Sequence, residues 1–239
     1  MRPALADLLS YLGEMGYGDL YLNARKAAPA PAPAAEAPIP AAPPAPVDEE
    51  TAGRIAELAA LAGVAEACTR CRLAEGRTKV VFGSGNPTAE LMFVGEGPGA
   101  DEDRQGLPFV GAAGELLTRI IQAIEMTREE VYIANVVKCR PPGNRDPQPD
   151  EVAACRGYLD RQIALVRPRV LVALGKVAAQ ALLGNDSPIG RMRGQWYQVQ
   201  GIPAMVTYHP AALLRNQALK RPTWEDMQQV RDFLRSGNL

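Results

Sequence analysis

The 239-residue sequence contains little of several features that mark whole classes of proteins. It has only four cysteines, and no apolar run approaches the roughly 18–20 residues that cross a bilayer. The first residues also lack the basic stretch and apolar run of a secretory signal. These absences argue against a disulfide-rich secreted scaffold and against a membrane protein. We therefore expect a cytoplasmic, monomeric globular protein with no membrane partner.

The net charge of −1 hides an uneven distribution along the chain. Residues 1–125 carry 10 Lys and Arg against 17 Asp and Glu, whereas residues 126–221 carry 14 against 7 and therefore stand at +7. A basic stretch of this kind can face a polyanion such as a nucleic acid. It can equally be an ordinary solvated surface, so charge alone permits nucleic-acid binding without establishing it.

Composition divides the chain into three regions. Residues 1–26 hold leucines at helical spacing and predict a short amphipathic helix, which is either a docking element or an unattached end. Residues 27–50 predict a disordered linker, because 18 of the 21 residues from 27 to 47 are Ala or Pro. Residues 51–239 predict the folded domain. The leucines at helical spacing are Leu5, Leu8, Leu9 and Leu12.

Apolar runs alternate with helical patterns through this domain, which is typical of a parallel sheet covered by helices. We therefore predict an α/β fold, a three-layer α/β/α sandwich around a central, mostly parallel four-stranded sheet. In open sheets of this kind, ligands bind beyond the carboxyl ends of the strands. The predicted strands are Leu91–Val94, Val131–Val137, Val170–Leu174 and Ala204–Tyr208, and the predicted helices are 54–66, Gly114–Glu125, Pro149–Val166 and Gly175–Leu183.

The four cysteines form a candidate ligand set for a metal centre. Cys68-x-x-Cys71 precedes the first predicted strand, and Cys139 and Cys155 follow the second with 15 residues between them. Cysteines separated by two residues can bring both sulfurs to one centre. Four thiolates can hold either zinc or a [4Fe–4S] cluster. The spacing leaves the metal undecided, and it also leaves open that these are unrelated buried cysteines.

Two loops at the predicted ligand edge are rich in glycine. The segment Gly95-Glu96-Gly97-Pro98-Gly99 follows the first strand, so its backbone amides can approach a ligand closely, although a plain turn explains the same pattern. Downstream, Phe109 lies between Gly106 and Gly111. Its ring is therefore either part of the core or a stacking surface for a flat ligand.

Two polar residues lie at the ends of apolar strands. Asn135 closes the second strand, and a buried Asn must be hydrogen-bonded either to backbone or to a ligand. Its amide offers a donor and an acceptor, the pattern that matches the pairing edge of uracil. His209 is the only histidine and follows the fourth strand, so structural and catalytic roles are both open.

Taken together, these segments resemble the family 4 uracil-DNA glycosylases, the iron–sulfur branch of that superfamily. The resemblance runs from about Ala65 to Leu234 without large insertions, and it is specific because all the motifs occur jointly. It does not extend to residues 1–50. The matching stretches are Gly-Glu-Gly-Pro-Gly at 95–99, Gly-Leu-Pro-Phe-Val-Gly at 106–111, Ala-Asn-Val-Val-Lys-Cys at 134–139 and Thr-Tyr-His-Pro-Ala-Ala-Leu-Leu-Arg at 207–215.

The resemblance implies an enzyme of base excision repair that flips uracil out of single- or double-stranded DNA and hydrolyses its N-glycosidic bond, leaving an abasic site. The resemblance implies nothing for residues 1–26, and if they dock a partner, a repair or replication protein is the candidate we expect. The residues implied to bind uracil are Gly95, Glu96, Gly97, Phe109, Asn135 and His209. Those implied to press into the duplex are Leu213, Leu214 and Arg215, and those implied to hold a structural [4Fe–4S] cluster are Cys68, Cys71, Cys139 and Cys155.

The implied reaction puts negative charge on the departing uracil and positive charge on the sugar. His209 and the backbone amides would stabilise that anion where it forms. A water must then add to the sugar. Some relatives outside this family carry an Asp in the first motif, where this chain has Gly97. Glu96 is therefore the preferred candidate for positioning the water, with Glu102 behind it.

Three alternatives remain at this point. Relatives that trap uracil-DNA covalently carry a basic inserted loop with an additional His, whereas the segment 100–108 here has neither feature. A redox protein that uses the cluster directly would need neither Asn135 nor His209. A four-cysteine zinc protein that only binds DNA would lack the visible absorbance of an iron–sulfur cluster.

Overall fold

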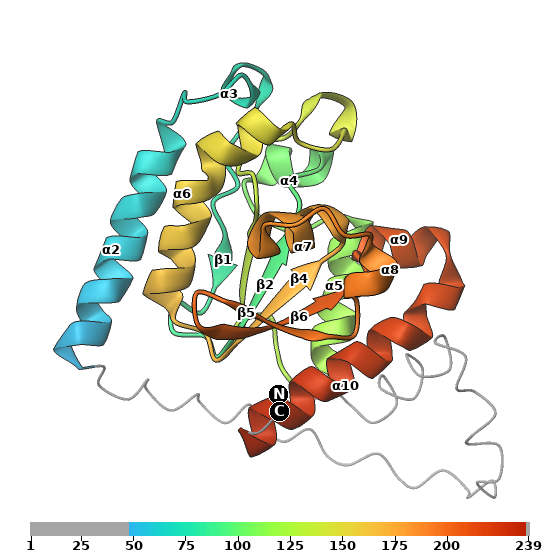
Figure 1. Cartoon of the computed structure of the whole chain (residues 1–239). Helices are drawn as coiled ribbons and strands as arrows, with labels where there is room; N and C mark the ends of the chain where they lie inside the picture. Colours follow the sequence, from blue (N-terminus) through green and yellow to red (C-terminus); the bar gives the residue numbers. More distant parts are fainter. Residues whose placement is uncertain (1–47, 238–239) are drawn as a thin grey trace, which may run out of the picture.

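The structure is a computed structural model that describes residues 48–237 (Figure 1). Its centre is a six-stranded sheet with the order β1-β3-β2-β4-β6-β5. The four inner strands are parallel, and each edge strand is antiparallel to its neighbour. The strands are β1 Ser84–Gly85, β2 Leu91–Gly95, β3 Tyr132–Asn135, β4 Val170–Leu174, β5 Trp196–Val199 and β6 Ile202–Thr207.

The predicted α/β/α fold and its four parallel strands are confirmed, but the predicted strand count of four is wrong, because two edge strands extend the sheet. β1 escapes prediction because two residues, one of them glycine, carry no periodicity. β5 escapes it because only the last of its four residues is buried, so its apolar pattern is weak. Such partial burial is common at a sheet edge.

Helices cover both faces of the sheet. α6 and α7 pack on one face with α2 laid against α6, and α5 and α10 pack on the other face (Figure 1). The alternation of side chains along each strand divides the core accordingly, so that Met92 and Val94 of β2 join the first face while Leu91 and Phe93 join the second. The helices are α2 Glu49–Glu66, α3 Leu73–Gly76, α4 Ala100–Gln105, α5 Ala112–Ala123, α6 Pro149–Val166, α7 Lys176–Leu183, α8 Ile189–Met192, α9 Pro210–Arg215 and α10 Lys220–Ser236, with 3-10 turns at Pro142–Asn144 and Gln217–Leu219.

Helix α2 begins earlier than predicted. Its first residue is Glu49, inside the predicted 27–50 linker, because Asp48 caps the helix by accepting a 2.7 Å hydrogen bond from the Thr51 amide. The helix then runs along α6, where Arg54 Nη1 donates to the Leu165 carbonyl at 2.6 Å. The predicted helix within 1–26 and the rest of the linker lie outside the described residues.

Helix α10 was not among the predicted elements, although its sequence carries a helical signal. Trp224, Met227 and Val230 are spaced three apart and are buried against the second face of the sheet. Polar residues surround them, which dilutes the apolar pattern. Within residues 48–237, no helix is both long enough and apolar enough to cross a bilayer.

Candidate active site and cysteine cavity

A pocket of about 560 Å³ opens at the carboxyl ends of the parallel strands, where ligand binding is expected. β2 and β3 enter it side by side, because Gly95 pairs with Asn135 in their register. The structure therefore brings together residues that lie more than a hundred positions apart in the chain. Those of the predicted site residues that line this pocket are Glu96, Gly97, Glu102, Phe109, Asn135, His209 and Arg215.

Gly95 sits beneath the pocket and has no room for a side chain. A Cβ at this position would lie 2.4 Å from Asn135 Oδ1 and 2.5 Å from Phe109 Cζ. Real Cβ contacts are essentially never that short. Glycine is therefore required here because the Asn135 amide and the Phe109 ring both approach the backbone of β2 closely.

Asn135 presents an unpaired acceptor in this pocket. Its side chain is 1% exposed, and its Oδ1 has no hydrogen-bond partner among the described residues. A buried polar atom left without a partner costs about 1–3 kcal/mol. Since Asn135 also lines the pocket, the free Oδ1 is placed to accept a hydrogen bond from a ligand.

Phe109 is held in a strained backbone conformation beside His209. Its φ of 54° is in the left-handed region, which bulky residues rarely adopt. Gly114 permits this turn, because a Cβ there would lie 1.9 Å from the Phe109 carbonyl oxygen. The Phe109 and His209 ring centroids are 5.5 Å apart with 32° between their planes. The two rings thus form one wall of the pocket.

His209 is neutral in this environment. Burial, reinforced by the nearby Arg215 cation, lowers its pKa to about 4. Its Nδ1 accepts a hydrogen bond from the Ala211 amide at 3.2 Å, so the neutral ring carries its proton on Nε2. Gly175 fits against it, because a Cβ there would lie 2.9 Å from His209 Cβ. The pocket therefore contains a fixed, uncharged N–H donor.

The Glu96 carboxyl lies in the pocket wall and has a strongly raised pKa. Burial and the negative charge of Asp146 raise the pKa of Glu96 to about 7, against the opposing effect of Lys176. A carboxyl whose pKa lies near neutrality can take up or release a proton under physiological conditions.

Glu102 lines the pocket and is hydrogen-bonded to backbone amides through both carboxylate oxygens. Its Oε2 accepts from the Gly99 amide at 3.1 Å, and its Oε1 accepts from the amides of Val110 and Gly111 at 3.0 and 3.1 Å. Both carboxylate oxygens are thus engaged with backbone. Glu102 joins the Gly95–Gly99 loop to the loop that carries Phe109, and this arrangement favours a positioning role over contact with water.

The residues that were predicted to press into the duplex, at 213–215, are only partly exposed. Leu213 is fully buried in the second core, so the prediction that it presses into DNA is wrong. Helix α9 turns this position inward and leaves Leu214 and Arg215 on the outside, with Leu214 41% exposed. Of the three predicted residues, only Leu214 and Arg215 are therefore exposed to a partner.

The four cysteines lie together although they come from three separate segments. Cys68, Cys71, Cys139 and Cys155 line one small cavity of about 20 Å³, and all four are free thiols. Within residues 48–237, no three His, Cys, Asp or Glu side chains are grouped to hold a single metal ion.

Positive charge surrounds these sulfurs. Arg77 Nη1 donates to Cys139 Sγ at 3.3 Å and to the Cys68 carbonyl at 2.6 Å, while the Arg70 guanidinium lies 4.2 Å from the Tyr158 ring centroid in the same cavity wall. Burial raises the pKa of the Cys139 thiol. These cations are placed to balance an anionic group bound by the thiolates.

Sequence reasoning missed a buried lysine that connects the two sites. Lys138 is 2% exposed and lines the cysteine cavity, and its Nζ donates to the Asn135 carbonyl at 2.7 Å and to the Gln162 side chain. Burial lowers its pKa to about 8. A lysine between Val137 and Cys139 was a signal in the sequence, because a charged residue directly after an apolar strand is seldom buried without a partner.

Several known proteins that are similar to this chain are described as uracil-DNA glycosylases. A family model described as the uracil DNA glycosylase superfamily matches residues 82–228. A type-4 uracil-DNA glycosylase of Sulfurisphaera tokodaii is 47% identical over 175 residues, which are 70% of this chain and 80% of that protein. Type-4 uracil-DNA glycosylases of Saccharolobus solfataricus and Thermotoga maritima are each 45% identical, over 71% and 70% of this chain and 82% and 90% of their own lengths. This chain therefore belongs to the uracil-DNA glycosylase superfamily and, within it, to the type-4 family.

Proposed function

We propose that this chain removes uracil from DNA by hydrolysing the bond between base and sugar, leaving an abasic site. The observation that carries this proposal is the unpaired Oδ1 of Asn135, buried in a pocket shared with Phe109 and His209. Uracil N3–H donates to that oxygen, and the Asn135 amide nitrogen donates to uracil O4. Cytosine has no hydrogen at N3, so it leaves the oxygen unpaired at a cost of about 1–3 kcal/mol.

Recognition requires that the base leave the stack. Extrusion costs a few kcal/mol and is easiest at a mispaired or unpaired base. Phe109 offers its ring to the face of the extruded base, and its strained backbone holds that ring in place. Leu214 and Arg215, exposed beside the pocket, are the side chains that we assign to the space the base leaves.

Departure of uracil leaves negative charge on the ring. His209 presents a neutral Nε2–H, which donates to uracil O2 as that oxygen gains charge. A neutral donor suits this task because it stabilises the anion without being titrated near neutral pH. Backbone amides of the glycine-rich loop at 95–97 add further donors.

Addition of water completes the reaction. Glu96 lines the pocket and is partly ionised at neutral pH, so its carboxylate can position a water for attack on the sugar carbon. Glu102 supports the site from behind through its three backbone contacts. Glu96 thus positions the attacking water, and Glu102 fixes the two loops that carry the pocket residues.

The four cysteines fit a [4Fe–4S] cluster better than a zinc ion. They share one cavity and are flanked by Arg70, Arg77 and Lys138, whose positive charges suit an anionic thiolate-bound cluster. A cluster distributes one thiolate to each of four irons and needs a wider ligand set than a mononuclear site. When bound, the cluster would supply structural bracing, because hydrolysis transfers no electrons.

The decisive experiment uses a uracil-containing oligonucleotide, single-stranded or paired, followed by alkali to break abasic sites. We expect cleavage at the uracil and none at a thymine in the same position. Absence of cleavage by folded protein with visible cluster absorbance would contradict the proposal. A covalent protein–DNA band on a denaturing gel would instead indicate a trapping protein.

A further inference from the structure

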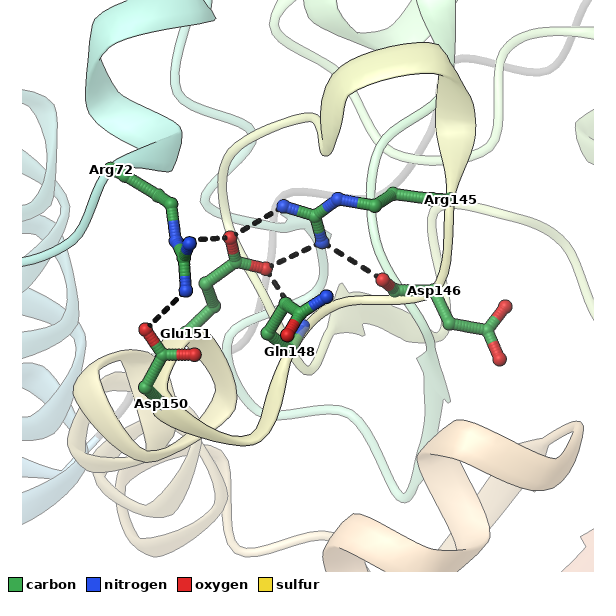
Figure 2. A network of polar contacts seen from close by, with 6 residues as sticks. All are labelled: Arg72, Arg145, Asp146, Gln148, Asp150 and Glu151. Atoms are coloured by element: carbon green, nitrogen blue, oxygen red, sulfur yellow. Dashed lines mark hydrogen bonds and ion pairs between the residues drawn. The ribbon is translucent and has the colours of Figure 1, made fainter.

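A buried carboxylate near the start of α6 is the centre of a polar network (Figure 2). The Glu151 side chain is fully buried. Arg145 binds it with two parallel hydrogen bonds of 2.7 and 2.8 Å, the Gln148 amide donates at 2.7 Å, and Arg72 Nε lies 3.2 Å away. The hydrogen bonds from Arg145 hold the pKa of Glu151 at about 2, so it stays charged.

The network joins three segments with different tasks. Arg72 follows Cys71 directly, and Glu151 precedes Cys155 by one helical turn on α6. Arg145 belongs to the stretch 141–148, which contributes to the wall of the uracil pocket. One carboxylate thus binds the cysteine-bearing segments and the pocket wall to each other.

The connection continues from Arg145 to Glu96. Arg145 Nη1 also donates to the Asp146 carbonyl at 2.9 Å. The Asp146 carboxylate lies 3.5 Å from Lys176 Nζ, and its charge helps to raise the pKa of Glu96. Displacement of Arg145 would therefore change both the shape of the pocket wall and the charges that face Glu96.

Helix capping alone does not account for this arrangement. Capping explains the bond between the Gln148 amide and Glu151, which needs no arginine. A buried ion pair is weak support for stability, because desolvation offsets much of its attraction. A bidentate arginine supplied by the pocket wall therefore calls for a role in the pocket itself.

We propose that Glu151 is a positioning residue that holds the 141–148 wall of the uracil pocket in a fixed relation to the cysteine-bearing segments. The proposal rests on the proposed function, since the wall matters for catalysis only if the pocket excises uracil. Glu151 does not touch substrate. It acts through Arg145.

The test compares Glu151→Gln with Asp150→Asn, a matched control on the same helix turn that breaks only an exposed contact of Arg72. We expect E151Q to keep its visible cluster absorbance, to lose about tenfold to a hundredfold in kcat, and to show faster amide exchange in 141–148. D150N should remain within about twofold of the parent.

The pH profile separates positioning from simple stabilisation. In E151Q the positive charge of Arg145 loses its partner, and the negative charge of Asp146 moves away from Glu96. Both changes favour the ionised form of Glu96 and lower its pKa, so the acid limb of the pH profile of excision should move to lower pH. His209 is neutral throughout this range. The other charged side chains around Glu96 are those of Asp101, Glu102, Lys176 and Arg215.

Arg145 provides a second route if E151Q fails to fold. Arg145→Gln should reproduce the slower excision and the faster exchange, and Arg145→Lys should restore them only in part, because lysine keeps the charge without the bidentate geometry. Unchanged excision and exchange in R145Q would overturn the proposal. So would a loss of melting temperature, absorbance and activity in parallel with an unshifted pH profile.

Failure of the proposed function would be visible separately. If the parent protein cuts no uracil, amide exchange of 141–148 still reports whether Glu151 holds this wall. Unchanged exchange in both variants would then reject the network on its own.

Discussion

The uracil pocket and the cysteine cavity share one short piece of chain but are built in opposite ways. Asn135 lines the first and Cys139 the second, only four residues further on. The pocket measures about 560 Å³ and contains an unpaired acceptor, whereas the cysteine cavity measures about 20 Å³ and is flanked by cations. The first therefore offers a buried acceptor in an open pocket, and the second holds thiols close to positive charge.

This difference implies that substitutions in the two sites should have different effects on catalysis and on stability. The Asn135 Oδ1 has no partner among the described residues and the His209 ring accepts one backbone hydrogen bond, so removal of either side chain should affect chemistry and spare the fold. The cysteines lie between α3, α6 and the end of β3, so their loss should affect the fold first. Lys138 links the two, because it donates to the Asn135 carbonyl from the wall of the cysteine cavity.

The largest effects on catalysis are expected at His209 and Asn135. His209→Ala removes the Nε2–H donor that we assign to uracil O2 and should lower kcat by about 10²–10³. Asn135→Ala should lower the rate of excision to a similar extent, because the hydrogen bonds that we assign to the pairing edge of uracil are lost. Single-turnover excision measures both. Unchanged visible absorbance and melting temperature serve as controls, and normal cutting by both variants would refute the pocket assignment.

The ionisation of Glu96 should set the pH dependence of the excision rate. Excision needs its carboxylate ionised, so the rate should rise as pH increases through about 7 and fall below it. His209 adds no break above its own pKa of about 4. Glu96→Gln should lower kcat by about 10² and flatten the profile. A Gln variant that retains the same acid limb would assign the titration to another group.

Substitutions in the cysteine cavity should affect stability first and catalysis only as a consequence. Cys155→Ala should remove the visible absorbance and lower the melting temperature, and excision should fall only as the loaded, folded fraction falls. Ala153→Ser, an exposed change on the same helix, is the control. If Cys155→Ala keeps its melting temperature but lowers kcat, the cysteine cavity takes part in the reaction. The proposed separation between a catalytic pocket and a structural cavity would then be wrong.

Much of this organisation was predictable from the sequence, because it depends on local patterns. The four inner strands are continuous apolar runs, and their carboxyl ends carry Gly95, Asn135 and His209. A parallel sheet places such ends at one edge, so the pocket followed from the order of the elements. Residues 1–47 carry patterns too, but they lie outside the described residues.

What the sequence could not predict depends on burial and on distant partners. Leu213 and Leu214 are the same residue type side by side, and only the packing of α9 shows that the first is buried. The contact of Glu102 with Gly99 is a local capping contact, but nothing local indicates that Glu102 also accepts from the amides of Val110 and Gly111 or that Asp146 faces Glu96. These relations join segments whose spacing in the chain carries no periodicity.

The two leucines give a smaller, more selective test. Leu213→Ala should cost about 2–5 kcal/mol of stability, because it leaves a cavity in the second core. Leu214→Ala should leave stability unchanged and lower excision from duplex DNA more than from single strands, since only the duplex must be opened. The ratio of the two rates is the measurement. An equal effect on both substrates would remove Leu214 from base extrusion.

The smallest effect is expected from deletion of residues 1–47. Every residue assigned here to the pocket or to the cysteine cavity lies between Cys68 and Arg215. A chain beginning at Asp48 keeps the cap of α2, so the helix that packs on α6 should still form. We therefore expect excision of a short oligonucleotide, visible absorbance and melting temperature to match those of the full chain. A marked loss of excision with absorbance and melting temperature unchanged would show that the first 47 residues contribute to DNA engagement, and that the pocket is not sufficient alone.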